Sequence, residues 1–84
     1  MKIPQHILET KDVVEDLAKR WITKQYKKAK EYILQGVIWS TDFKQRQPKL
    51  SWVWSFRINK QFRAIGHFNA QDELIISYID NHQS

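Results

Sequence analysis

The chain has 84 residues, a net charge of +5 and no cysteine. This length predicts one domain, residues 1–84, and the 42% of hydrophobic residues indicate a packed core rather than disorder. The lack of cysteine excludes disulfides and thiolate chemistry. No apolar run reaches the ~20 residues of a membrane span, and the N-terminus lacks the apolar core of a signal peptide, so we expect a soluble cytoplasmic protein.

Positive charge is concentrated in the middle of the chain. From Lys19 to Arg63 the sequence has twelve Lys and Arg residues against two acids, Glu31 and Asp42. Such a stretch favours an anionic partner, which can be nucleic acid, an acidic protein or a membrane surface. The alternative is that the charge only keeps the protein in solution.

Two helices are predicted in the first half. Asp12 with Glu15 resembles a capping box, and apolar residues then follow at helical spacing, which predicts a first helix near residues 12–21. A second helix is expected near 24–35, capped by Thr23 and ended by Gly36. Its apolar stripe comprises Ile22, Tyr26, Ala29 and Ile33. Its other face carries Lys24, Lys27, Lys28 and Lys30, a pattern more typical of solvated surface than of a binding site.

The second half changes from helical to alternating periodicity. The segments "WVWSFRI", "QFRAIGHF" and "ELIISYI" predict strands near 51–58, 62–68 and 73–79, and residues 42–46 can add a short edge strand before Pro48. Short polar turns between the strands favour an antiparallel meander. We therefore expect an α+β fold, with the two N-terminal helices packed on one face of a three- or four-stranded antiparallel sheet.

Alternation also assigns faces to the strands. The apolar sets of the second and third predicted strands share one face only if their loop has an odd number of residues, which a three-residue loop at 59–61 satisfies. The loop would bend through a left-handed or bulged residue at Asn59 or Lys60. Phe62 would then face Ile58.

The same register sets Arg63 opposite Arg57 on the face away from the core. Like charges in this position destabilise a sheet, but two guanidinium groups can together hold a phosphate. Alternatively, both arginines point into solvent, or one of them pairs with an acid from the last strand region: Asp72, Glu73 or Asp80.

Histidine and tryptophan complete the candidate residues. His82, after the last strand, has the unperturbed pKa of a general acid or base, although a histidine at a chain end is more often a surface residue. His6 and His67 share no metal-ligand spacing with it, so no metal site is expected. All four tryptophans are expected in the core or between helices and sheet: Trp21, Trp39, Trp52 and Trp54.

The stretch "WSFRINKQFRAIGHF…ELIISYIDNHQ" resembles the C-terminal half of the RelE/ParE superfamily of type II toxin–antitoxin toxins, in its small RelE-like branch. The pattern lies in residues 54–59, 62–66 and 79–82. The preceding "DFKQRQPK" resembles the family segment that follows the second helix. The resemblance covers about residues 12–83 and is most specific from Arg57 to His82.

This resemblance implies an RNase that cuts mRNA in the ribosomal A site without metal or cofactor and is neutralised by an acidic antitoxin protein. The 2′-hydroxyl attacks the adjacent phosphate, and positive charge stabilises the transition state. By the same resemblance, Arg63 holds the scissile phosphate, Arg57 is the basic residue of the preceding strand and His82 is the proton donor. The RNA-binding set is Lys44, Arg46, Lys49 and Lys60.

The sequence also departs from the family. It ends two residues after His82, where relatives often continue to a tyrosine, and the family's long first strand would shrink to a few residues around Ile3. Three functions therefore remain open from the sequence. They are a metal-independent endoribonuclease that represses translation, a catalytically inactive RelE/ParE-fold protein that binds RNA, gyrase or another protein, and non-specific RNA binding by the lysine-rich second helix.

Overall fold

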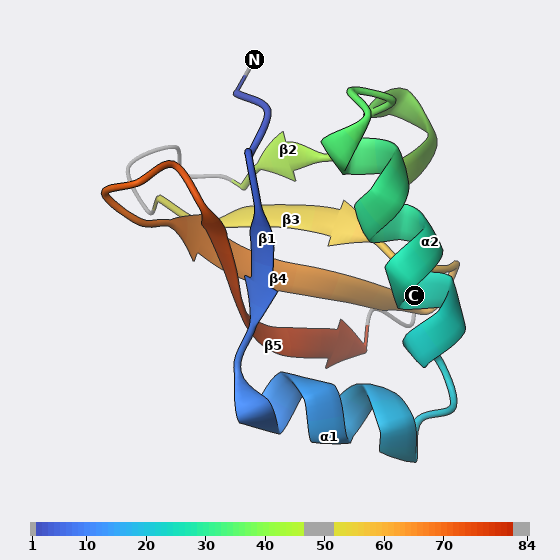
Figure 1. The fold of residues 1–84 in the computed structure, drawn as a ribbon. Coiled ribbons are helices and arrows are strands. Elements are labelled where there is room, and N and C mark those ends of the chain that lie inside the picture. The colour runs from blue at the N-terminus through green and yellow to red at the C-terminus, as the bar shows by residue number, and fades with distance from the viewer. Residues whose placement is uncertain (1, 47–51, 82–84) are drawn as a thin grey trace.

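The computed structural model describes residues 2–46 and 52–81. In chain order the elements are β1 (Ile7–Glu9), α1 (Lys11–Lys19), α2 (Thr23–Leu34), the 3₁₀ turn η1 (Trp39–Thr41), β2 (Lys44–Gln45), β3 (Trp54–Arg57), β4 (Phe62–Phe68) and β5 (Leu74–Asn81). Figure 1 shows α1 running beside the last part of β5, and α2 at the end of β3 and β4. No helix in the described residues is long and apolar enough to cross a membrane.

The strands form one five-stranded sheet in the order β1-β5-β4-β3-β2. The α+β class is as predicted, but the expected three- or four-stranded antiparallel sheet is wrong, because β1 adds a fifth strand that runs parallel to β5. β1 lies at Ile7–Glu9 rather than around Ile3. Three residues are too few to show a period of two, and the partner strand of β1 lies at the other end of the sequence, so the pattern could not reveal it.

The helix ends differ from those predicted. The N-cap of α1 is Thr10, whose hydroxyl accepts a hydrogen bond from the backbone N–H of Val13 at 3.3 Å, so Asp12 lies in the first turn instead. In α2, Thr23 is the first helical residue and caps nothing with its side chain. Gly36 does follow the helix end in the left-handed conformation, with φ 83°.

The core lies between the helices and one face of the sheet. The α2 stripe Ile22, Tyr26, Ala29 and Ile33 is buried as predicted, and it joins one cluster with residues such as Phe56, Ala64 and Ile76. The Tyr26 and Phe56 rings, with centroids 5.8 Å apart, connect α2 to β3.

The prediction for the tryptophans is wrong for three of the four. Trp54 is half-buried between the rings of Phe43 and Phe68. Trp21, Trp39 and Trp52 are 93%, 77% and 72% exposed. α1 ends before Trp21, which takes a left-handed conformation with φ 59° and so leaves the helical face that its spacing suggested.

A bulge changes which side chains of β5 reach the core. Ile65 pairs with Tyr78 while Gly66 pairs with Ile76, so Ser77 is an extra residue in β5. Ile79 is therefore buried and Tyr78 is exposed. The site requires glycine at position 66, because a Cβ there would collide with the carbonyl oxygen of Ile75.

A polar cluster on the helix side of the sheet links β1 to α2. The Glu9 carboxylate accepts a hydrogen bond from the Tyr26 hydroxyl at 2.7 Å and one from the Lys30 ammonium at 2.9 Å. Burial, together with the hydrogen bond to this carboxylate, raises the pKa of Tyr26. Lys30 thus differs from the other α2 lysines, because it is a structural partner of Glu9.

Candidate functional site

The turn between β3 and β4 sets the two candidate arginines opposite each other. As predicted, Arg57 and Arg63 are register partners, and the backbone N–H of Ile58 donates to the carbonyl oxygen of Phe62 across a three-residue loop. No loop residue has a positive φ, so the predicted left-handed bend is wrong. Instead, Asn59 Oδ1 accepts the backbone N–H groups of Gln61 and Phe62, each at 2.8 Å, which holds the turn.

The two arginines do not close on a common point, because Arg63 has an acidic partner. Arg63 Nη2 donates to Asp42 Oδ2 at 2.7 Å, and its side chain is only 14% exposed. None of the three acids named from the sequence is this partner. Asp42 comes from the loop between η1 and β2, where it has φ 50°, so its contact with β4 depends on the tertiary fold.

Asp42 collects positive charge at this edge of the sheet. Lys44 Nζ lies 3.4 Å from the same carboxylate oxygen that Arg63 contacts. The hydrogen bond from Arg63, followed by that from Lys44, lowers the pKa of Asp42 against a smaller opposing effect of burial. Asp42 is thus ionised at neutral pH and holds Arg63 in one orientation.

This cluster leaves buried donor capacity unused. Within the described part of the chain, two buried side-chain polar atoms have no hydrogen-bond partner, Arg63 Nη1 and Ser55 Oγ. Ser55 alternates with Phe56 along β3 and so points to the same side of the sheet as Arg57. Unsatisfied buried polar groups are rare in native structures and often mark functional positions.

Arg57 behaves differently from its register partner. Its side chain is exposed, and Nη2 lies 3.5 Å from the carbonyl oxygen of Ser40, at the outer limit of a hydrogen bond. It lines an open cavity of about 260 Å³ between α2, η1 and β3, together with Lys28 and Tyr32 of the helix. Nothing in the sequence pattern indicated this cavity, because its walls come from three separate segments.

The remaining candidates are placed as follows. Lys44 pairs with Ser55 in the β2–β3 ladder and joins Arg63 at Asp42. Arg46 is half-buried just after β2, and its backbone N–H bonds to Val53. Lys60 is exposed in the β3–β4 turn. Lys49 and His82 lie outside the described residues, so their predicted roles stay predictions.

Comparison with known proteins now bears on this arrangement. No protein-family model matches the sequence, and no curated protein matches it either. One solved structure, titled as the YoeB dimer from Staphylococcus aureus, matches with a TM-score of 0.66 and covers 93% of this chain and 97% of its own. The chain has the fold of YoeB. Sequence identity is 15%, so the likeness extends to the backbone and leaves the roles of individual side chains to be argued separately.

YoeB is a RelE/ParE-superfamily type II toxin. The fold that the sequence resemblance implied is therefore confirmed by an independent comparison of structures. The likeness spans nearly all of YoeB, so the short chain carries the whole fold of that toxin. The residue missed from the sequence is Asp42. Its signal was present, since it is one of only two acids between Lys19 and Arg63.

Proposed function

We propose that this protein is a RelE-like toxin that cleaves mRNA on the ribosome, represses translation and is neutralised by an acidic antitoxin protein. The observation that carries the proposal is the Asp42–Arg63 ion pair, which holds a guanidinium group with a free buried donor on the side of the sheet away from the core. The fold of YoeB and the basic middle of the chain support it.

The chemistry needs no metal. The 2′-oxygen of the RNA attacks the adjacent phosphorus and loses its proton, while the bond to the 5′-oxygen breaks and that oxygen gains a proton. The products are a 2′,3′-cyclic phosphate and a 5′-hydroxyl. Arg63 would stabilise the extra negative charge on the phosphate oxygens in the transition state, with Arg57 adding positive charge nearby and His82 supplying the proton.

The test compares three forms of the protein expressed in growing cells, with cleaved mRNA ends mapped by sequencing. We expect wild type to arrest growth and cut mRNA, and Arg63→Ala to lower cleavage by about a hundredfold or more. Arg20→Ala is the matched control, because Arg20 makes a similar ion pair with Asp16 at 2.9 Å on α1. Equal cleavage by wild type and Arg63→Ala would refute the assigned role.

A second candidate is a catalytically inactive protein of the same fold that binds RNA, gyrase or another protein. It is favoured by the burial of Arg63, since a guanidinium already bound to Asp42 is less free to grip a phosphate. This candidate predicts no mRNA cleavage by wild type. Recovery of gyrase rather than ribosomes with the tagged protein would then identify the branch of the superfamily.

A further inference from the structure

The cavity beside α2 has the chemistry of an anion site. Lys28 and Arg57 supply two cations to its wall, and Gln25, Tyr32 and Ser40 add polar groups. Its volume of about 260 Å³ is open to solvent rather than enclosed, so a segment of a larger ligand can enter. A phosphate placed between Lys28 and Arg57 would receive charge-assisted hydrogen bonds from both.

The positive charge of this wall is not neutralised within the described residues. Lys28 has no ion pair there, and Glu31, three residues on, instead accepts a hydrogen bond from Gln35 at 3.0 Å. Lys24 lies four residues before Lys28, on the same face of the helix, and like charges at this spacing weaken a helix by a few tenths of a kcal/mol. An anionic ligand would remove that repulsion.

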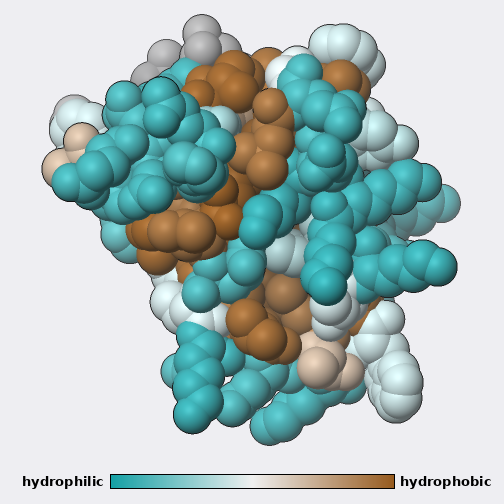
Figure 2. All heavy atoms as spheres, viewed as in Figure 1, coloured by the Kyte–Doolittle hydropathy of each residue, from teal (hydrophilic) through white to brown (hydrophobic). Residues whose placement is uncertain are grey.

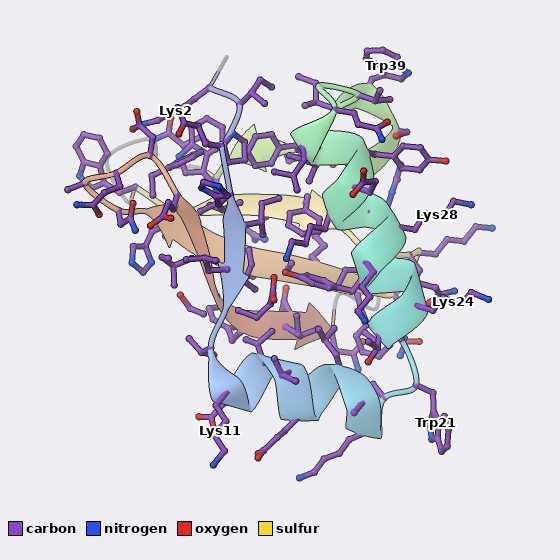
Figure 3. All side chains as sticks on the ribbon, in the orientation of Figure 1. Lys2, Lys11, Trp21, Lys24, Lys28 and Trp39 are labelled. Carbon is purple, nitrogen blue, oxygen red and sulfur yellow. The ribbon has the colours of Figure 1, made fainter. Side chains whose placement is uncertain are left out.

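Exposed aromatic rings flank these lysines. We name Trp21, Lys24, Lys28 and Trp39 the α2 ridge; Figure 3 shows all four pointing away from the body of the molecule on the side of α2. In Figure 2 the same side carries projecting hydrophilic side chains. Trp21 and Trp39 are 93% and 77% exposed, which leaves their ring faces open to solvent.

We propose that the α2 ridge and its cavity bind single-stranded RNA, with a phosphate held between Lys28 and Arg57 and bases stacked on Trp39 and Trp21. Cations that follow the backbone, interleaved with aromatic rings that accept any base, are how proteins bind single strands without reading their sequence. The inference rests on the proposed function in taking RNA as the ligand. It adds a second contact outside the Asp42–Arg63 cluster, on the helix side of β3.

The ridge favours RNA over an acidic peptide. Carboxylates would satisfy Lys28 and Arg57 but offer no flat surface to the two tryptophans. Each nucleotide instead brings one charge and one ring system, which matches the alternation of lysine and tryptophan along the ridge. An acidic antitoxin segment on this surface is the competing outcome.

The experiment measures binding of a short 2′-O-methyl oligoribonucleotide to the full chain at several salt concentrations. This probe lacks the attacking hydroxyl, so the result does not depend on catalysis. Each lost phosphate contact should make the slope of log K against log salt shallower by about 0.7, so Lys28→Ala should reduce it by that amount. Lys27→Ala is the matched control, because Lys27 lies on α2 but lines a different cavity, next to Glu9 and Tyr26.

The aromatic part has its own control. Trp39→Ala should weaken binding about fivefold or more through lost stacking, whereas Trp52→Ala should not, since Trp52 is 72% exposed but precedes the opposite end of β3 from Arg57. Equal effects of the paired variants, or equally tight binding of a glutamate octapeptide, would overturn the proposal. Lost binding in Lys28→Ala with no mRNA cleavage by wild type would sustain this site and reject the endonuclease.

Discussion

Two carboxylates of the molecule each hold two donors, one on each side of the sheet. On the helix side, Glu9 accepts hydrogen bonds from the Tyr26 hydroxyl and the Lys30 ammonium at 2.7 and 2.9 Å. On the other side, Asp42 contacts Arg63 at 2.7 Å and Lys44 at 3.4 Å. The Glu9 cluster is the more enclosed, because the glutamate side chain is 20% exposed and that of Asp42 is 38% exposed.

The two clusters differ in what they leave over. The Glu9 cluster matches its donors to one acceptor and joins β1 to α2. The Asp42 cluster combines two cations with one acid and leaves Arg63 Nη1 buried without a partner in the described residues. A balanced cluster stabilises the fold, whereas an excess of positive charge and donors is suited to an anionic ligand. The comparison assigns Glu9 to stability and Asp42 to function.

The largest expected effect is on the helix side. Glu9→Ala leaves the buried Tyr26 hydroxyl without its acceptor, and such a loss costs about 1–3 kcal/mol. We expect the free energy of unfolding, measured with urea, to fall by about 2 kcal/mol. Glu9→Gln keeps an acceptor for Tyr26 and should fall by less.

Glu15→Ala serves as the control, since Glu15 is exposed on α1 and substitutions of this kind change stability by less than about 0.5 kcal/mol. If Glu9→Ala and Glu15→Ala gave the same unfolding curve, the Glu9 cluster would not be structural. The comparison between the two sides of the sheet would then lose one half.

The two clusters also show what the sequence can and cannot reveal. The register of Arg57 and Arg63 followed from the odd loop length, because a slip of one residue would expose Phe56 and Ala64. Asp42 meets Arg63 through a left-handed turn far away in the chain, and β1 is too short to show alternation. Periodicity within a segment was therefore readable, whereas contacts made between segments were not.

A smaller effect is expected at Asp42, and in two directions. Asp42→Asn should lower the free energy of unfolding by less than about 1 kcal/mol, because a carboxylate this exposed is well screened. It should at the same time tighten binding of the 2′-O-methyl oligoribonucleotide, since Arg63 and Lys44 lose their neutralising charge. A stability loss as large as that of Glu9→Ala, with unchanged RNA affinity, would place Asp42 in the same structural class as Glu9.

The smallest effect is the pH dependence of this contribution. Because the Arg63 hydrogen bond, and then that of Lys44, lower the pKa of Asp42 in the folded state, the unfolded chain binds more protons at acidic pH. The stabilisation is therefore fully present above the ordinary carboxyl pKa of 3.8 and is lost as the pH falls through the lowered folded value.

Urea unfolding of wild type and Asp42→Asn between about pH 2 and 6 measures this directly. The difference in free energy of unfolding should be smallest in strong acid, rise with pH through the region below 3.8 and then stay level. A difference that stayed constant down to the lowest pH would mean that Asp42 acts by packing or by its turn conformation rather than by its charge. In that event Arg63 would be oriented by a neutral neighbour, and its excess positive charge could not be attributed to a balance with Asp42.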